Sequence, residues 1–108
     1  MAVAWFRRRP DAAAERVSSD LEHLESFVRT RVGVEAYLEP KTTVTEPTMV
    51  LIANDGEWTR RRVPSHQHAR GWAHRMGIPV YDVALTGYPN RMREYNQRRK
   101  SEDGQPTS

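Results

Sequence analysis

Apolar residues near the start of the chain recur with the period of an amphipathic helix, over residues 11–32. They follow one another at spacings of four, three, four and four: Val17, Leu21, Leu24, Val28 and Val32. One face of this helix must therefore be buried against another element. Asp11, which follows a proline, is the expected N-cap, and Gly33 supplies the left-handed residue that ends the helix.

The next segments have the patterns of β-strands. Residues 34–39 alternate apolar and polar side chains, as in a strand with one face on the core. Residues 41–47 lie between prolines and are expected to form a loop. Residues 48–53 are almost entirely apolar, which indicates a strand covered on both faces. Asn-Asp-Gly at 54–56 is a hairpin turn, so residues 57–63 should return antiparallel.

The returning strand does not alternate cleanly. Trp58 and Val63 would lie on opposite faces of a regular strand, and Arg60 and Arg62 would share the face of Trp58. Either a bulge intervenes, or the tryptophan lies at the rim of the sheet with arginines beside it.

A second helix and a last strand complete the predicted fold. Ser65 is a good N-cap for a helix that Gly77 closes, and residues 78–85 follow as a buried strand. A strand, a helix and a strand in succession form a right-handed crossover, so the last strand should run parallel to the one before the helix. The predicted fold class is α+β: a two-layer sandwich of order α-β-β-β-α-β, with a small mixed four-stranded sheet and both helices on one face.

The chain has 108 residues, enough for one core but not for two. Hydrophobic residues make up only 37% of it, so we expect a lean core with polar termini. We divide the chain into an aromatic and basic arm over residues 1–10, a single α+β domain over residues 11–89, and a tail over residues 90–108 that is first basic and then disordered.

The composition also bears on location. The opening places six mostly apolar residues before Arg7, Arg8 and Arg9, which is the reverse of a secretory signal and too short to span a bilayer. The chain has no cysteine, which excludes disulfides and thiolate metal sites and fits a reducing compartment. We therefore expect a cytoplasmic protein without a membrane-inserted segment.

Motifs for metal binding and catalysis are absent from the sequence. His66, His68 and His74 lack the i, i+4 spacing that places two imidazoles on one zinc ion. The glycines are too scattered for a phosphate loop, and no nucleophile elbow or dinucleotide fingerprint occurs. We predict no cofactor, no metal and no catalytic residue. An enzyme would have to use residues far apart in the sequence, such as Glu57, His74, Tyr81 and Asp82.

Charge is sorted along the chain. Residues 58–100 hold ten bases against two acids, whereas residues 11–57 hold ten acids against four bases. The net charge of +3 therefore hides a strong dipole, which governs encounters with partners more than it governs the fold.

The basic half contains the candidate binding residues. On the second helix the apolar stripe points inward, so the basic residues there should face solvent near the arginines of the preceding strand. Phosphate binding needs several cations on one surface, and exposed aromatic rings can stack on bases. The candidate site residues are Arg60, Arg61, Arg62, Arg70, His74, Arg75, Tyr88, Arg91, Arg93, Tyr95, Arg98 and Arg99.

A topological likeness points toward RNA. The order helix, three strands, helix over residues 11–77 resembles a double-stranded RNA-binding domain, and Ala-Arg-Gly-Trp-Ala at 69–73 is similar to the Ala-Lys-x-x-Ala of that family's second helix. The sequence departs from the family where His66 and Gln67 replace a lysine pair, and where residues 40–47 lack a Gly-Pro-x-His pattern. A further strand also follows.

Three functions are compatible with these observations. The leading hypothesis is a non-catalytic binding module that engages a polyanion through an arginine-rich face, most specifically RNA or a ribonucleoprotein. The alternative is a protein adaptor, or a homodimer in which the basic half of one copy meets the acidic helix of another. A small enzyme of unknown reaction is the third. Against all of them, the arginines could simply pair with the acidic first helix.

Overall fold

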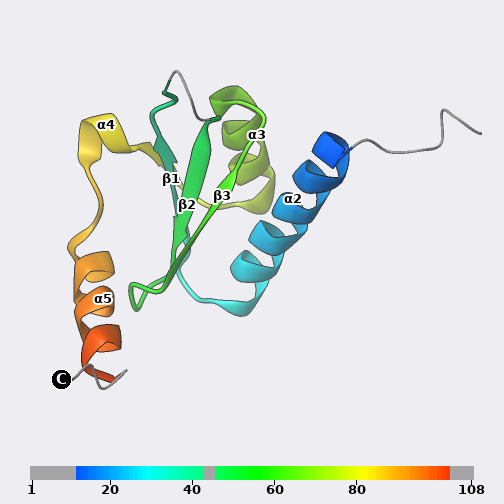
Figure 1. Ribbon diagram of the computed structural model, residues 1–108. Helices are drawn as coiled ribbons and strands as arrows, with labels where there is room; N and C mark the ends of the chain where they lie inside the picture. Colours follow the sequence, from blue (N-terminus) through cyan, green and yellow to red (C-terminus); the bar gives the residue numbers. More distant parts are fainter. Residues whose placement is uncertain (1–11, 43–45, 103–108) are drawn as a thin grey trace, which may run out of the picture.

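The computed structural model describes residues 12–42 and 46–102, which form one four-stranded mixed sheet and its covering helices (Figure 1). The order of the elements confirms the predicted α+β class. In chain order they are α2 (Ala12–Thr30), β1 (Glu35–Glu39), β2 (Thr48–Ile52), β3 (Trp58–Arg62), α3 (His66–Met76), β4 (Val80–Asp82), α4 (Val83–Thr86) and α5 (Asn90–Glu102).

Two predicted segments fall wholly or partly outside this description. The arm over residues 1–10 is not described, and neither is the end of the tail, residues 103–108. Among the residues that are described, no helix combines the length and the apolar character needed to cross a bilayer.

The strands lie in the order β3-β2-β1-β4. β1 pairs antiparallel with β2, and β2 pairs antiparallel with β3. β4 pairs parallel with β1, so it runs in the same direction as β3, as the crossover predicts. The crossover nevertheless carries β4 past β2 and β1 to the opposite edge of the sheet, and not to the side of β3.

The larger core lies between the sheet and the two long helices of the predicted fold. Leu24 and Phe27 of α2 and Trp72 of α3 pack against Leu38 and Leu51 in one cluster. Figure 1 shows α2 and α3 on the same side of the sheet. The predicted limits of α3 hold, because Ser65 Oγ accepts a hydrogen bond from His68 N at 3.0 Å and Gly77 ends the helix at φ 74°.

A second, smaller core covers the other face of the sheet, which the two-layer prediction does not include. Tyr37, Val50 and Ile52 meet Met92 of α5 in this cluster, with Trp58 packed partly against it. Contacts with the sheet therefore continue beyond residue 89, and α4 and α5 lie opposite α2 and α3 (Figure 1).

The register of β3 shows whether a bulge interrupts the strand near Trp58. Pairing with β2 runs without interruption from Ile52 opposite Trp58 to Thr48 opposite Arg62, so no bulge intervenes. Trp58 belongs to the second face of the sheet, and the guanidinium of Arg60 lies 5.3 Å from the centre of its ring.

The last strand is shorter than predicted. The sequence indicates a buried strand over residues 78–85, but only Val80–Asp82 pair with β1 and none of these three residues is buried. Asp82 ends the strand because its Oδ1 accepts a hydrogen bond from Ala84 N at 2.9 Å, which caps the short helix α4. Leu85, expected inside, is 85% exposed.

Candidate polyanion-binding surface

Arg60 is the most tightly engaged of the predicted site residues. Its Nε and Nη2 donate to the two carboxylate oxygens of Glu39, each at 2.8 Å. The cross-strand register produces this pair, because Glu39 lies opposite Thr48 and Arg60 lies opposite Val50 on the same face. A guanidinium held in this bidentate way and stacked on Trp58 has its charge neutralised within the chain.

Glu39 accepts hydrogen bonds from two side chains besides Arg60. Thr48 Oγ1 donates to its Oε1 at 2.5 Å, and the hydroxyl of Tyr88 donates to its Oε2. Burial alone would raise the pKa of Glu39, but the hydrogen bonds from Arg60, Thr48 and Tyr88 outweigh it and lower the pKa to about 2. Tyr88, a predicted stacking residue, is thus tied to the end of β1.

Arg61 faces the opposite side of β3 and meets the first helix. Its Nε lies 3.6 Å from Asp20 Oδ1, and its Nη1 donates to the carbonyl oxygen of Arg60 at 2.8 Å. This is the pairing with the acidic helix that competes with a polyanion ligand.

Arg91 joins α5 to the sheet. Its Nη2 donates to Glu35 Oε1 at 2.7 Å, and its Nε donates to the carbonyl oxygen of Ala53 at 2.9 Å. The hydroxyl of Tyr37 donates to the same Glu35 oxygen at 3.0 Å. Burial, aided by this bond, raises the pKa of Tyr37 to about 12. Arg91 is therefore a structural residue of the second face.

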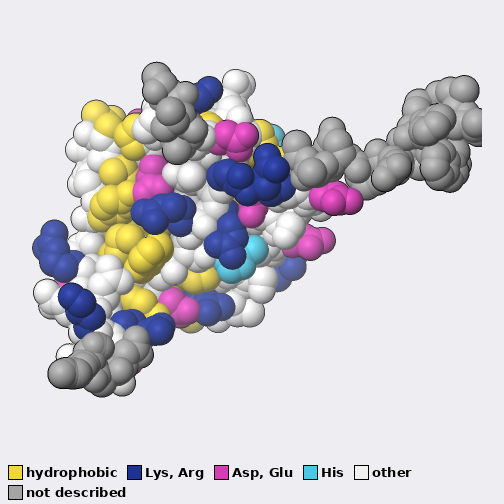
Figure 2. Space-filling view, viewed as in Figure 1, with side chains coloured by type: hydrophobic (Ala, Val, Ile, Leu, Met, Phe, Trp, Pro, Cys, Tyr) yellow, Lys and Arg dark blue, Asp and Glu magenta, His cyan; other side chains and the backbone are white. Residues whose placement is uncertain are grey.

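The other predicted residues divide between two helices that the sheet separates. Arg70, His74 and Arg75 are exposed on α3, which packs on the first face. Arg93, Tyr95, Arg98 and Arg99 lie on α5, which packs on the second face through Met92, and the exception is Arg62, at the end of β3. The predicted set therefore does not form one continuous surface, and Figure 2 shows Lys and Arg side chains in several groups with acidic side chains between them.

Arg93, Arg98 and Arg99 of α5 differ from Arg60, Arg61 and Arg91 in their partners. Arg93 donates to Asn90 Oδ1 at 3.2 Å, and Arg98 donates to the carbonyl oxygen of Asp55 at 2.6 Å. Arg99 donates to the hydroxyl of Tyr95 at 3.0 Å. Among the described residues, Arg93 and Arg98 form no ion pair, so neutral acceptors orient their charges without cancelling them.

Aromatic rings accompany these charges. The guanidinium carbons of Arg98 and Arg99 lie 5.9 and 5.8 Å from the centre of the Tyr95 ring. In the next residue, Asn96, Oδ1 accepts a hydrogen bond from the indole nitrogen of Trp58 at 2.8 Å. Trp58 is half-buried and joins α5 to β3. The sequence pattern of the strand did not predict this contact.

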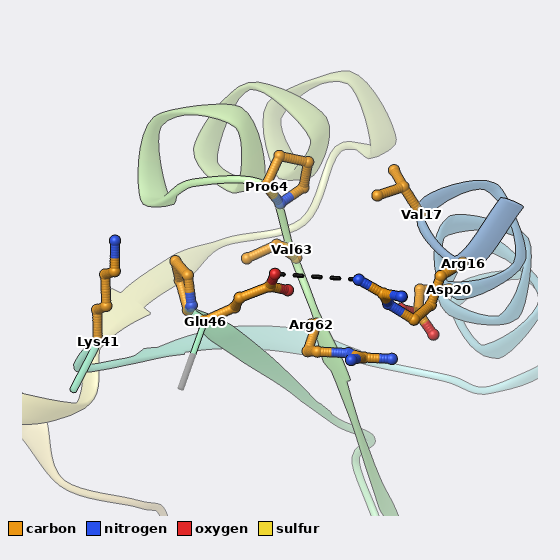
Figure 3. Close-up of a pocket in the computed structure, with 9 residues that line it drawn as sticks. Arg16, Val17, Asp20, Lys41, Glu46, Arg62, Val63 and Pro64 are labelled. Atoms are coloured by element: carbon orange, nitrogen blue, oxygen red, sulfur yellow. Dashed lines mark ion pairs between the residues drawn. The ribbon is translucent and has the colours of Figure 1, made fainter. Parts of the chain in front are cut away.

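Another group of charged residues lines a shallow cavity of about 280 Å³ (Figure 3). Arg16 lies 4.0 Å from Glu46 there, with Arg62 and Asp20 beside them. In Figure 3, Lys41 points away from Arg16 and Arg62. The three cations do not aim at one point and two acids lie among them, so the cavity is not an anion site.

The residues that could serve catalysis or metal binding are dispersed. Glu57 binds Arg31 through both carboxylate oxygens, at 3.1 and 2.6 Å, and Asp82 caps α4. Within the described part of the chain, no group of His, Asp and Glu could hold a metal ion. The imidazole of His66 contacts the backbone oxygen of Glu39 at 2.8 Å.

Sequence reasoning missed one polar pair between elements. His23 Nε2 of α2 lies 2.6 Å from Thr59 Oγ1 of β3. Burial lowers the pKa of His23, and the nearby charge of Arg61 lowers it further. The two residues lie 36 positions apart, and only the packing of α2 on β3 brings them together.

No family model, curated protein or solved structure matches the chain. A proposal about its function therefore rests on the residues and contacts of this chain alone.

Proposed function

We propose that the protein is a non-catalytic binding module that engages a polyanion, most specifically RNA or a ribonucleoprotein, through helix α5. The observation that carries the proposal is the state of the charges on this helix. Arg93 and Arg98 are exposed and are hydrogen-bonded to neutral acceptors, so their charges remain available to phosphates.

Helix α5 suits this role better than α3, the other basic helix. Five bases stand against two acids on α5, and Tyr95 lies among them with guanidinium groups over its ring. On α3 the one aromatic residue, Trp72, is buried. Phosphate contacts combined with a ring that can stack on a base are the typical features of single-stranded RNA binding.

The mechanism is electrostatic capture followed by local contacts. The basic half of the chain attracts the polyanion, Arg93 and Arg98 contact phosphate oxygens, and Tyr95 offers its ring to a base. Arg60, Arg61 and Arg91 do not take part, because carboxylates of the same chain already hold them.

The experiment is RNA binding by fluorescence anisotropy at salt concentrations from about 50 to 200 mM. A mixed-sequence single-stranded RNA should bind with an affinity that falls steeply with salt. The double variant R93Q/R98Q should weaken binding and reduce the slope of log K against log salt by about 2, one unit for each lost phosphate contact.

The matched control is R70Q/R75Q, which removes two exposed arginines from α3 on the opposite side of the sheet. It should leave affinity and slope nearly unchanged. A larger loss in R70Q/R75Q than in R93Q/R98Q would move the surface to α3, and an absence of salt-dependent binding by the unmodified chain would refute the proposed function.

A further inference from the structure

Another cavity lies at the outer edge of β3, where α2 approaches the strand. β3 is the last strand on its side of the sheet, and in Figure 1 it runs between α2 and α5. α2 contributes His23, Ser26 and Phe27 to the lining, and β3 contributes Trp58 and Thr59. The volume of the cavity is about 190 Å³. We call it the β3-edge cavity.

The cavity contains a planar cation that is fixed in place. Arg31 lines the cavity, and its guanidinium carbon lies 4.8 Å from the centre of the Phe27 ring. Glu57 accepts hydrogen bonds from Nε and Nη2 of this guanidinium at 3.1 and 2.6 Å, which fixes its plane and neutralises its charge. The side chain of Arg31 is nevertheless 36% exposed. Unpaired bases in RNA complexes stack on aromatic rings and on guanidinium planes of this kind.

The other hydrogen-bonding groups of the cavity are uncharged. His23 Nε2 lies 2.6 Å from Thr59 Oγ1. Burial and the charge of Arg61 lower the pKa of His23 from 6.5, so the neutral ring predominates at neutral pH. A hydroxyl can donate one hydrogen bond and accept two, so the contact with His23 uses only part of the capacity of Thr59. Ser26 adds an exposed hydroxyl. This lining fits a flat, uncharged, polar group better than a phosphate, because Arg31 is already paired.

The size and the place of the cavity narrow the choice of ligand. Pockets for drug-sized ligands have about 300–1,000 Å³, so this smaller cavity suits a single base. It also adjoins α5, because Trp58 donates its indole hydrogen bond to Asn96 at 2.8 Å. Arg98 of the same helix donates to the carbonyl oxygen of Asp55, two residues before Glu57, which lines the cavity as well. A strand whose phosphates contact α5 can therefore place a base at the cavity.

We propose that the β3-edge cavity binds one unpaired nucleobase of the single-stranded RNA that α5 holds, an inference that rests on the proposed function. The base lies against the guanidinium of Arg31, and its edge forms hydrogen bonds with the hydroxyls of Thr59 and Ser26. α5 binds the phosphates of any sequence, whereas the cavity adds a contact that only a base can make.

The first test uses nucleosides, which carry a base but no phosphate. In NMR spectra of the full chain, the ring signals of His23 should shift during titration with adenosine or cytidine to about 10 mM, a range suited to so small a ligand. The variant S26W fills the cavity with an indole and should abolish this shift. Ser26 is exposed on α2, so the variant should keep the thermal unfolding midpoint of the parent. S19W is the matched control, with the same substitution at another exposed serine of α2 that does not line the cavity, and it should keep the shift.

The second test measures RNA binding by the same variants. S26W should bind single-stranded RNA about tenfold more weakly than S19W does, the effect of one lost base contact. The slope of log K against log salt should be equal in the two variants, because S26W loses no phosphate contact. The double variant R93Q/R98Q differs, since it lowers that slope.

Two outcomes would overturn the inference: a His23 ring that no nucleoside shifts, or equal RNA affinities of S26W and S19W. Neither outcome would affect phosphate binding through α5. Conversely, an absence of salt-dependent RNA binding would refute the proposed function. The nucleoside titration, which needs no phosphate contact, would still show whether the cavity takes a base.

Discussion

The guanidinium of Arg91 in α5 binds the carboxylate of Glu35 in β1, with Nη2 2.7 Å from Oε1, although the two residues lie 56 positions apart. Arg91 also donates to the backbone of Ala53 at the hairpin. These contacts attach the last helix to the sheet, and Met92 beside them fills the smaller core.

Replacement of Arg91 by glutamine should therefore destabilise the fold. Glu35 would lose its cationic partner, and the carbonyl of Ala53 would keep only its hydrogen bond from Gly56 N, so we expect a loss of about 1 to 3 kcal/mol in the free energy of unfolding by urea. Arg93→Gln is the control, because Arg93 is exposed and should change this free energy by less than about 0.5 kcal/mol. Equal effects of the two variants would contradict a structural role for Arg91.

Gly56 should not accept alanine. Its φ of 95° lies in the left-handed region, and a Cβ there would collide with the backbone oxygen of Arg91. Gly77 has a similar φ of 74° but nothing within 4 Å of the added atom, so Gly77→Ala reports the backbone strain alone, about 1 kcal/mol or more. Gly56→Ala should cost about 1 to 3 kcal/mol beyond that. Equal losses in urea unfolding would mean that α5 does not approach the hairpin as described.

Glu39 should make stability depend on pH. Its pKa in the folded chain is about 2 against an ordinary 4.5, so the ionised carboxylate stabilises the fold above about pH 5 and this contribution is lost as the pH falls toward 2. The variant E39Q should be less stable at neutral pH by about 1 to 2 kcal/mol, a value reduced because Arg60 is partly open to solvent. The difference from the parent should shrink steadily in acid.

The control for this titration is E22Q, at an exposed position on α2. Its unfolding free energy should differ from that of the parent by less than about 0.5 kcal/mol at each pH. A gap between parent and E39Q that stays constant from neutral to acid pH would contradict the lowered pKa.

The imidazole of His23 should titrate below its ordinary range. Burial and the charge of Arg61 both disfavour the cation, so NMR titration of the His23 ring should give a pKa below 6.5. Arg61→Gln removes that charge and frees Asp20, and both changes should raise the pKa. Arg70→Gln on α3 should leave it unchanged. A pKa that does not rise in Arg61→Gln would refute this arrangement of α2 on β3.

Local patterns predict most of the elements. Helical spacing identifies α2, and the N-cap Ser65 and the closing Gly77 also identify α3, because these signals lie within a few residues of the features they specify. The predicted N-cap of α2, Asp11, lies outside the described residues. The hairpin and the antiparallel strands follow from the turn at 54–56. For 78–85, apolar content suggested a buried strand, but the cap formed by Asp82 turned the chain into a helix after three paired residues.

The arrangement of the candidate site residues was less predictable, since it depends on register. The pairs Arg60–Glu39 and Arg91–Glu35 join residues 21 and 56 positions apart. Each forms because of the face that its strand or helix presents, which a count of charges along the chain does not reveal. The division of the arginines between two sides of the sheet has the same cause.

The late position of α5 has a consequence during synthesis. Val50 and Ile52 are fully buried in a cluster whose helical cover includes Met92. While the chain is still growing on the ribosome, the sheet can form before α5 has been synthesised. One apolar face of the sheet then stays exposed to water until α5 emerges. Apolar surface that is exposed during folding promotes aggregation, so variants that loosen α5 should aggregate during expression more than their unfolding free energies alone suggest.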